Sequence, residues 1–369
     1  MRGEANIQQF SPASSAPKKD DMDYISRINA LLQPRPDDGP LAVDLFAGCG
    51  GLALGFEAQG FRTHGFEMEQ DCCVTYEKNL HGQCDNVFLT PETPLPQAPV
   101  IIGGPPCQPF SVGGKQMGHK DERNGFPAFI GAVRNLKPEI WLMENVRGLF
   151  YKNRWYLDEV VNALKELDYI VEPPRLINAV DYGVPQNRER VIVVGHRGRF
   201  NFPAPQKGKI TAGEALGDLA FSTPENAKFL TSSQDTYIAN YEKASCCITP
   251  RDLHLDRPSR TLTCRNLAGA TGDMMRIRLP DGRRRRITAR EAARLQSFPD
   301  WFEFTGTESS QFYQIGNAVP PMLSFCLANA VRSYLESNFR YSIKEIRQIN
   351  RESLFDFIPV GEAVNDCCA

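Results

Sequence analysis

The sequence lacks the features of membrane, secreted and zinc-binding proteins. It has no apolar run near the roughly 18–20 residues that a transmembrane helix needs. Its opening segment, MRGEANIQQFSPASSAPKKDD, contains no apolar stretch of the kind found in a secretory signal. No two cysteines have the CxxC spacing of a structural zinc site. We therefore expect neither a membrane partner nor a bound metal.

The eleven cysteines are scattered through the chain and do not form a disulfide framework. Three pairs are adjacent in sequence, at 72–73, 246–247 and 367–368, and neighbouring cysteines rarely bond to each other. Free thiols persist in reducing compartments. The cysteine pattern therefore predicts an intracellular, cytoplasmic protein.

The composition allows a packed core, and the charge is distributed unevenly. Hydrophobic residues make up 41% and charged residues 23% of the 369 residues, enough for one large or two smaller domains. The net charge is 42 − 44 = −2, but the stretch from Arg257 to Arg294 holds eleven arginines and three acids, a local balance of +8. Arginine suits bidentate contacts with phosphates and bases, although such a run can also be a solvated surface.

An alternation of strands and helices follows an N-terminal arm. Residues 1–39, rich in Ser, Pro, Ala, Asp and Lys, are expected to be disordered, with one short helix near 24–32. Expected strands lie at 41–46, 61–66, 100–102, 140–143 and 190–195, and expected helices at 52–59, 71–79, 126–136 and 155–167. This order predicts an α/β fold with a doubly wound, mostly parallel, Rossmann-like sheet.

The pattern changes near residue 197. Residues 198–256 are rich in Pro, Gly, Ser and Thr and show no helical period, whereas 261–264 and 275–279 look like strands. A helix is expected over 288–296, where Thr288 and Glu291 have the spacing of a capping box. An apolar helix follows GNAVPP at 322–334. We expect a larger domain at 40–196, a smaller one at 197–311, a return to the larger at 312–336, and a C-terminal tail at 337–369.

A glycine-rich turn predicts a cofactor site. The segment DLFAGCGG, Asp44–Gly51, follows an expected strand and opens a helix, and its glycines let a ligand approach the backbone. Glu67, at the end of the next strand, is placed to hold ribose hydroxyls. An adenosine-containing cofactor is predicted. The spacing Gly48-x-Gly50-x-x-Ala53 also fits a dinucleotide fingerprint, and a structural turn without function is a further alternative.

Three further segments predict catalytic groups at one sheet edge. In GGPPCQPFS, two prolines fix the backbone before Cys107, and a polar run suited to a lid follows, so this cysteine is a candidate nucleophile rather than part of a rigid turn alone. Glu144, which ends the strand at 140–143, is a candidate acid for a substrate ring, although the tripeptide ENV is often structural. In QNRER, Arg188 and Arg190 are expected to face the same side and reach one anionic or carbonyl-rich target.

Taken together, these segments resemble the DNA (cytosine-5) methyltransferases of prokaryotic restriction–modification systems. The likeness covers about Leu41 to Tyr334, and the blocks have the family's order: DLFAGCGG, the Glu67 strand end, GGPPCQPFS, ENV, QNRER, RPSRTLT with RRRRITAREAARLQSFP, and GNAVPP. The resemblance implies methylation of a cytosine in a short sequence of double-stranded DNA, with S-adenosyl-L-methionine as the cofactor. It also implies a monomer with a cognate restriction endonuclease as its functional partner.

The resemblance also assigns roles to individual residues. Cys107 would attack C6 of a flipped-out cytosine, Glu144 would engage N3 and the exocyclic amine, and Arg188 and Arg190 would hold the base. The matching cofactor-contacting positions are Phe46, Gly48, Gly50, Glu67, Met68, Pro106 and Asn317. The smaller domain, with its arginine run, would face DNA.

The sequence departs from the family pattern at three places. Met68 stands where the family often has Trp, the acid expected near 88–90 to contact the adenine amine is missing, and APVII before GGPPC lacks an acid often found there. The alternatives are a tRNA cytosine-5 methyltransferase, whose Cys-Phe-Thr signature is missing, and a dehydrogenase, which leaves PPCQ, ENV and QNRER unexplained. A catalytically inactive DNA-binding module is disfavoured because both Cys107 and Glu144 are present.

Overall fold

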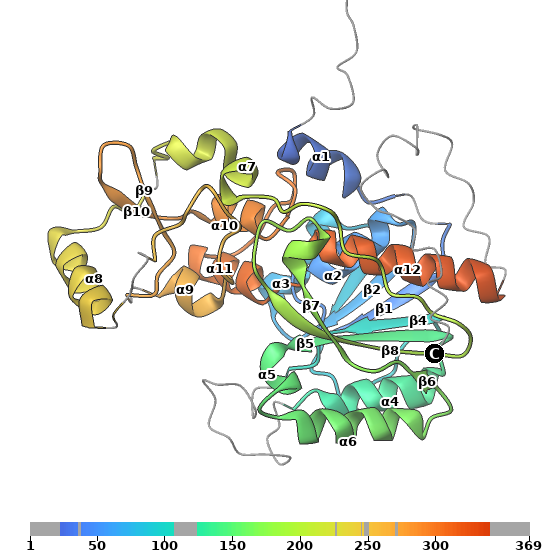
Figure 1. Ribbon diagram of the computed structural model, residues 1–369. Coiled ribbons are helices and arrows are strands. Elements are labelled where there is room, and N and C mark those ends of the chain that lie inside the picture. Colours follow the sequence, from blue (N-terminus) through green and yellow to red (C-terminus); the bar gives the residue numbers. More distant parts are fainter. Residues whose placement is uncertain are drawn as a thin grey trace, which may run out of the picture.

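The computed structural model describes residues 23–35, 38–106, 124–225, 227–244, 246, 251–269 and 272–339. Its larger lobe is built on one eight-stranded sheet, and its smaller lobe carries a two-stranded hairpin (Figure 1). Cys107 lies outside the described residues.

The large sheet is mixed, with its parallel strands consecutive. The strand order is β3-β2-β1-β4-β5-β8-β6, and β7 also pairs with β8. Strands β1 to β5 are mutually parallel, whereas β8 runs antiparallel to β5, β6 and β7. The strand bounds are Leu41–Leu45 (β1), Arg62–Glu67 (β2), Gln83–Asn86 (β3), Val100–Gly103 (β4), Ile140–Val146 (β5), Ile170–Val171 (β6), Arg175–Asn178 (β7) and Glu189–His196 (β8). The expectation of a mostly parallel, Rossmann-like α/β sheet is confirmed.

Helices cover both faces of this sheet, as its apolar strands require. On one face, α2 (Gly51–Ala58) and α12 (Pro321–Phe339) pack over Ala42, Ile102 and Leu142. On the other, α4 (Phe126–Leu136) and α6 (Arg154–Lys165) pack over side chains that alternate with these along the same strands (Figure 1). The remaining large-lobe helices are α3 (Gln70–Asn79), α5 (Arg147–Phe150) and the 3₁₀ helix η3 (Ala179–Tyr182).

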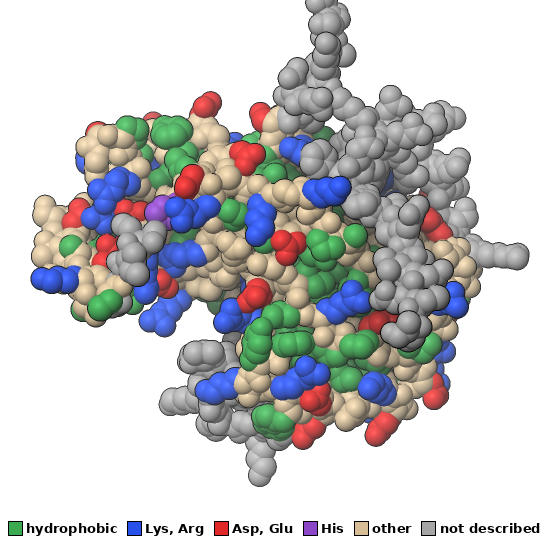
Figure 2. Space-filling model, viewed as in Figure 1, with side chains coloured by type: hydrophobic (Ala, Val, Ile, Leu, Met, Phe, Trp, Pro, Cys, Tyr) green, Lys and Arg blue, Asp and Glu red, His purple; other side chains and the backbone are tan. Residues whose placement is uncertain are grey.

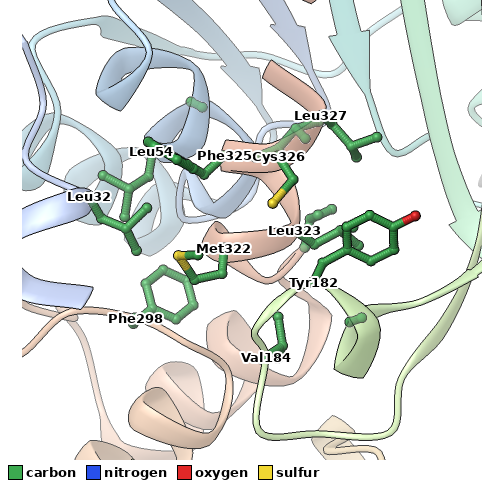
Figure 3. Close-up of a cluster of buried hydrophobic side chains, with 14 of the residues drawn as sticks. Leu32, Leu54, Tyr182, Val184, Phe298, Met322, Leu323, Phe325, Cys326 and Leu327 are labelled. Atoms are coloured by element: carbon green, nitrogen blue, oxygen red, sulfur yellow. The ribbon is translucent and has the colours of Figure 1, made fainter. Parts of the chain in front are cut away.

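Helix α12 returns the chain to the larger lobe and packs directly on α2. A Cβ at Gly55 would overlap the backbone between Ser324 and Phe325, so the two helices approach closely because this residue is glycine. Figure 3 shows Leu54 of α2 near Phe325, with Met322 and Leu323 extending the same cluster. Residues that lie far apart in sequence therefore complete one core.

The smaller lobe contains more helix than expected. Its elements are α7 (Ala212–Leu216), the 3₁₀ helix η4 (Gly217–Phe221), α8 (Ser232–Ala244), α9 (Cys264–Ala268), β9 (Arg276–Arg278), β10 (Arg284–Arg286), α10 (Ala289–Leu295) and α11 (Glu308–Asn317). Because α7 and α8 lie within 198–256, the expectation of no helix there was wrong. The strand expected at 261–264 is also wrong, because Thr263 and Asn266 form a capping box that starts α9. The capping box of Thr288 and Glu291 is confirmed.

The short helix expected near residues 24–32 is confirmed, and it is docked on the protein instead of belonging to a disordered arm. Helix α1 (Tyr24–Leu31) buries Tyr24 and Ile28, and Leu32 is also buried. The Tyr24 hydroxyl donates to the carbonyl of Gly183 at 3.1 Å. The side-chain oxygen of Asn29 accepts from the N–H of Asp300 at 2.7 Å. This helix therefore joins the two lobes at one side.

Two observations concern location and redox state. None of the helices in the described part of the chain is long and apolar enough to cross a membrane. All seven cysteines within the described ranges are free thiols, which agrees with the expected lack of a disulfide framework.

Candidate active site

Two of the side chains predicted to be catalytic, Glu144 and Arg190, lie at one edge of the large sheet. Strand β5 ends at this edge and the antiparallel strand β8 begins there, with Val146 opposite Arg190 in register. Arg190 Nε lies 2.8 Å from Glu144 Oε1, and both side chains are about 11% exposed. The antiparallel course of β8 therefore brings a strand-start arginine onto a strand-end acid.

The environment of Glu144 favours its protonated form more than water does. Burial raises the pKa of this carboxyl, and the guanidinium groups of Arg190 and Arg188 oppose the rise. Gly104, which follows β4, leaves space beside the acid, because a Cβ there would lie 3.2 Å from Glu144 Oε2. The acid can therefore hold a proton next to a ring nitrogen of a substrate.

Asn145 connects this acid to the proline turn that precedes Cys107. Its side-chain amide donates to the carbonyl of Pro105 at 2.8 Å, and its side-chain oxygen accepts from the N–H of Val146 at 2.9 Å. The N–H of Gly125 donates to the carbonyl of Pro106 at 3.1 Å. The turn is thus held from β5 and from the start of α4. The sequence expectations gave Asn145 no role, although it is the middle residue of ENV.

Arg188 is bound among backbone carbonyl groups inside the protein, whereas Arg190 pairs with Glu144. Arg188 precedes β8, so strand alternation does not apply to it. Arg188 is fully buried and donates to the carbonyl oxygens of Leu262, Gly316 and Ala318 at 2.8, 3.0 and 2.9 Å. Its guanidinium joins three chain segments instead of lining the cleft.

The glycine turn has the geometry expected of a cofactor site. Phe46, Gly48 and Gly50 all have positive φ angles, of 59°, 54° and 87°. Among the described residues, no atom lies within 4 Å of the position that a Cβ on Gly48 would take. Gly48 donates its N–H to Glu67 Oε2 at 2.9 Å. The turn therefore leaves open space directly beside the strand-end acid.

Glu67 organises the end of β2 through its carboxylate. Oε2 accepts from the N–H of Gly48, and Oε1 accepts from the N–H groups of Met68 and Glu69, each at 2.9 Å. Burial raises the pKa of Glu67 despite these three bonds. Met68 is 57% exposed next to this acid, and the Asn86 side chain donates to the Met68 carbonyl at 2.8 Å.

Pro106 and the segment that follows Asn317 both lie near the glycine turn. A Cβ at Gly51 would lie 2.5 Å from the Val319 carbonyl, which places the GNAV segment against the start of α2. The Cys264 thiol donates to Asn317 Oδ1 at 3.0 Å. A Cβ at Gly125 would lie 2.5 Å from Pro106 Cδ and 2.8 Å from Phe46 Cζ, so these groups also meet. The segments that contain Phe46, Pro106 and Asn317 therefore adjoin the glycine turn.

Asp44 adds an unsatisfied acid below the turn. Its carboxylate is buried, and neither oxygen has a hydrogen-bond partner among the described residues. Burial and the charge of Glu67 raise the pKa of Asp44 well above its usual range. The open space at Gly48, the acid at Glu67 and this unpartnered carboxyl fit an adenosine cofactor with a cationic group.

A cleft of about 710 Å³ separates the lobes at the Arg190 edge. Its large-lobe wall is made by Val146, Arg147, Asn178, Asn187, Glu189 and Arg190. Its small-lobe wall is made by Arg251, Asp252, Leu253, His254, Arg257, Pro258, Ser259, Arg260, Thr261 and Met275. Figure 2 shows Lys and Arg side chains gathered along the hollow between the lobes. Five arginines and two carboxylates line the cleft, which suits a polyanion.

Many side chains of the arginine run, which the sequence predicted to face DNA, make contacts within the protein. Arg276 and Arg285 are fully buried. Arg285 donates to both carboxylate oxygens of Glu291 at 2.9 and 2.7 Å. Other members pair with acids, as Arg294 does with Asp300 at 2.8 Å. Only part of the +8 balance can therefore face a ligand.

Metal binding is not indicated in the described part of the chain. There, no group of three or more His, Cys, Asp or Glu side chains could hold a metal ion.

The buried polar contacts that sequence reasoning missed include Gln186, whose amide donates to the Leu295 carbonyl at 3.2 Å. Its position inside QNRER was the only signal.

The fold and these sites define a class of protein: a Rossmann-like enzyme with an adenosine-cofactor site beside a basic cleft. The family model described as C-5 cytosine-specific DNA methylase matches residues 42–333. The chain therefore belongs to this family, and it is a DNA cytosine-5 methyltransferase. Members of the family in general use S-adenosyl-L-methionine.

Individual relatives agree with this assignment. The chain is 56% identical over 314 residues to the Type II methyltransferase M.AplI of Arthrospira platensis, covering 84% of this chain and 90% of that protein. It is 32% identical over 339 residues to the Type II methyltransferase M.NgoFVII of Neisseria gonorrhoeae, covering 81% and 88%. The solved methyltransferase EhMeth of Entamoeba histolytica shares the fold, with a TM-score of 0.63 at 18% identity over 81% and 99% of the two chains.

Proposed function

We propose that the chain methylates C5 of a cytosine flipped out of double-stranded DNA, through a covalent adduct with Cys107. The observation that carries this proposal is the Glu144–Arg190 pair, 2.8 Å apart at the sheet edge and next to the proline turn that precedes the cysteine. A stacked cytosine cannot reach a buried acid, so the base has to leave the duplex. Arg190 would then hold the base beside Glu144.

The chemistry assigned to the residues conserves atoms and electrons. The Cys107 thiolate forms a bond to C6, and the electron pair of the C5–C6 double bond moves toward N3, which Glu144 stabilises by donating a proton. S-adenosyl-L-methionine would supply an electrophilic methyl group to C5 and leave as S-adenosyl-L-homocysteine. Loss of the C5 proton to water then restores the C5–C6 double bond as the sulfur–C6 bond breaks and releases the Cys107 thiolate, and the N3 proton returns to Glu144.

The cofactor would lie over the glycine turn. Glu67 would accept hydrogen bonds from the ribose hydroxyls, and Phe46, Gly48, Gly50, Met68, Pro106 and Asn317 would surround the remainder. The buried carboxyl of Asp44 supports this placement, because a cationic group bound beside it would favour its ionised form. Glu67 would thus contact the ribose hydroxyls of the cofactor, and Asp44 would lie near its cationic group.

Arg188 would act as a positioning residue and not as a base contact. It donates to the carbonyl groups of Gly316 and Ala318, the residues on either side of Asn317 in sequence. Arg190 lies two residues after Arg188. Through these contacts, Arg188 would keep the cofactor side and the base side of the site in register. This role replaces the expected contact with the flipped base.

The domain division and the cellular setting complete the proposal. Residues 40–196 with 312–336 would form the catalytic domain and 197–311 the DNA-recognition domain, although α11 spans the boundary at 311. The chain would act in the cytoplasm as a monomer, in a restriction–modification system with a partner endonuclease. The relatives named as Type II methyltransferases support this setting.

Covalent trapping tests the proposal. Duplex DNA with 5-fluorocytosine at the methylated position should form a denaturation-resistant complex with the chain, because fluorine cannot leave C5 as a proton does. Cys107→Ala should form none, whereas Cys264→Ala, which removes another thiol of the site, should still form it. Trapping by Cys107→Ala, or labelling of tRNA instead of duplex DNA, would contradict the proposal.

A further inference from the structure

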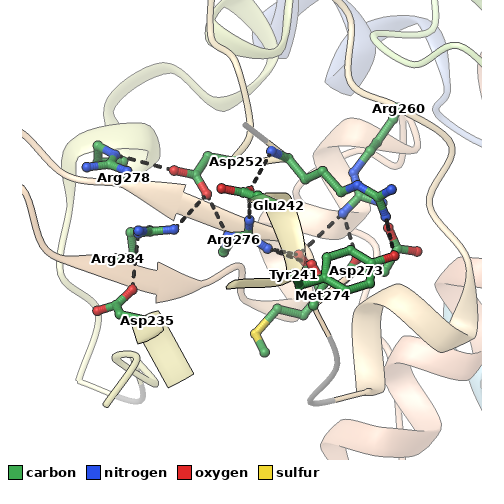
Figure 4. Close-up of polar contacts among 12 residues, drawn as sticks. Asp235, Tyr241, Glu242, Asp252, Arg260, Asp273, Met274, Arg276, Arg278 and Arg284 are labelled. Carbon is green, nitrogen blue, oxygen red and sulfur yellow. Dashed lines mark hydrogen bonds and ion pairs between the residues drawn. The ribbon is translucent and has the colours of Figure 1, made fainter. Parts of the chain in front are cut away.

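The small-lobe wall of the cleft contains a short segment, Arg251–His254, that a buried charge network holds in place. The carboxylate of Asp252 is 8% exposed and contacts three arginines of the hairpin. Arg276 Nε donates to it at 2.5 Å, Arg278 Nε at 3.3 Å, and Arg284 Nη1 lies 3.6 Å away (Figure 4). One acid therefore joins this segment to both strands of the β9–β10 hairpin.

The same segment is attached to the hairpin and to α8 through its backbone. The N–H of Leu253 donates to the carbonyl of Arg276 at 2.8 Å. Glu242 of α8 accepts from the N–H of Arg251 at 3.2 Å and from Arg276 Nη2 at 2.7 Å. Because Arg276 is fully buried, these contacts are shielded from solvent. The segment therefore has one backbone position relative to the cleft.

The side chain of Arg251 is oriented as well. Its Cζ lies 5.0 Å from the centre of the Tyr241 ring. Its Nη1 donates to the Tyr241 hydroxyl at 3.2 Å and to Asp273 Oδ1 at 3.1 Å. Asp273 also accepts from Arg260 Nη1 at 2.9 Å. Because the ring and the carboxylate already hold this guanidinium, it loses little conformational freedom when a ligand binds. Selective recognition of one ligand geometry requires such a preorganised side chain.

Arg251 and Arg190 line the same cleft from opposite walls. Arg190 belongs to the proposed base site, so DNA bound in this cleft would pass both the base site and Arg251. A fixed arginine fork in a DNA-binding cleft matches the O6 and N7 acceptors of guanine in the major groove. Arg257, by contrast, is exposed at the cleft and pairs only with its neighbour Asp256 among the contacts that the described residues show. That arrangement suits a phosphate.

We propose that Arg251 is a specificity-determining residue that recognises a guanine beside the target cytosine, and that Arg276 positions it through Asp252 and Glu242. The inference rests on the DNA cytosine-5 methyltransferase activity. The proposal explains why this lobe contains buried arginines. They hold the segment Arg251–His254 in place, and a small number of other side chains contact the DNA.

The test begins with the sequence that the full chain methylates, mapped by bisulfite sequencing. Each guanine of that site is then replaced, one at a time, by 7-deazaguanine, which lacks N7. One position should lower kcat/KM of the unmodified enzyme by about 5- to 150-fold. Arg251→Met removes every donor of the side chain and should be insensitive at that position only, whereas the matched control Arg257→Met should keep the original pattern.

A second variant keeps the test decisive if Arg251→Met folds poorly. Tyr241→Leu keeps the arginine at position 251 but removes the ring that orients its guanidinium. Replacing the same guanine by 7-deazaguanine should then no longer lower kcat/KM, while methylation of the site continues. If each 7-deazaguanine replacement lowers kcat/KM of both variants as much as it lowers that of the unmodified enzyme, the proposal is wrong. If the unmodified enzyme forms no 5-methylcytosine, the methyltransferase activity itself fails, which is a separate result.

Discussion

Glu144 and Arg190 face each other across β5 and β8, with Oε1 and Nε 2.8 Å apart. Parallel strands would put the start of one strand at the opposite edge of the sheet from the end of its neighbour. The antiparallel insertion of β8 removes that separation. A buried acid therefore lies beside a permanent positive charge at the edge where ligands bind in this class of sheet.

Replacing Glu144 should affect the chemical step more than DNA binding. Glu144→Gln removes the proton donor but keeps the shape, so the single-turnover methylation rate should fall by about 10²- to 10⁴-fold. Duplex affinity should change little. The control Glu189→Gln removes a partly exposed acid that pairs with Arg147 at the cleft, and its rate should stay within a few-fold of the original. An unaltered rate in Glu144→Gln would exclude the acid from the mechanism.

Two arginines of the sequence RRRR should differ sharply in their effect on stability. Arg285→Ala leaves Glu291 buried without its partner, which should lower the free energy of unfolding by about 3–5 kcal/mol. Arg283→Ala removes an exposed side chain and should change it by less than about 0.5 kcal/mol. Urea denaturation of the full-length variants measures both. Equal effects would show that burial does not distinguish these positions.

The contact between α2 and α12 should not tolerate a methyl group. Gly55→Ala places a Cβ against the backbone of Ser324 and Phe325 and should destabilise the chain by about 1–3 kcal/mol. Gly148→Ala in α5 meets open space among the described residues and should be neutral or slightly stabilising. Thermal unfolding of the two variants provides the comparison, and a neutral Gly55→Ala would disprove the close approach.

Asp44 should make the stability of the chain without cofactor depend on pH. Because burial raises its pKa, the folded chain binds this proton more tightly than the unfolded chain does. The resulting stabilisation is full below the unfolded-state pKa of about 4 and is lost as the pH rises through the folded-state value. Asp44→Asn cannot ionise, so its Tm relative to the original chain should rise between acidic and neutral pH.

The control for this prediction is Asp281→Asn in the β9–β10 turn. Asp281 is exposed, and the backbone N–H and side chain of Arg283 lower the pKa of its carboxyl. Its Tm difference should therefore show no comparable rise with pH. A Tm difference for Asp44→Asn that is constant with pH would mean that its carboxyl is not perturbed.

The sequence predicted the larger lobe well because its central strands are continuous apolar runs. Strands such as VIIG, Val100–Gly103, are buried on both faces, and their hydrophobicity alone distinguishes them. Strand β3, Gln83–Asn86, was missed because three of its four side chains are exposed at the sheet edge. A strand of this kind is defined by its hydrogen-bonded neighbour, which no local pattern shows.

Side-chain partners from distant segments account for most of the remaining differences. The charge count of the arginine run was correct, but Arg276 binds Asp252 and Glu242, which lie outside the run in sequence. Arg188 similarly finds carbonyl groups near residues 262 and 316–318. Local sequence records which charges are present. Tertiary contacts decide which of them remain available to a ligand.

The contact of Gly51 with Ala318 and Val319 bears on how the protein is made. The ribosome synthesises the glycine turn early, but the residues that cover it emerge only after the whole smaller lobe. Until then, the apolar face of α2 is exposed on the nascent chain and the cofactor surface is incomplete. A transcript truncated before α12 therefore yields a polypeptide that contains every proposed catalytic side chain and still cannot assemble the enzyme.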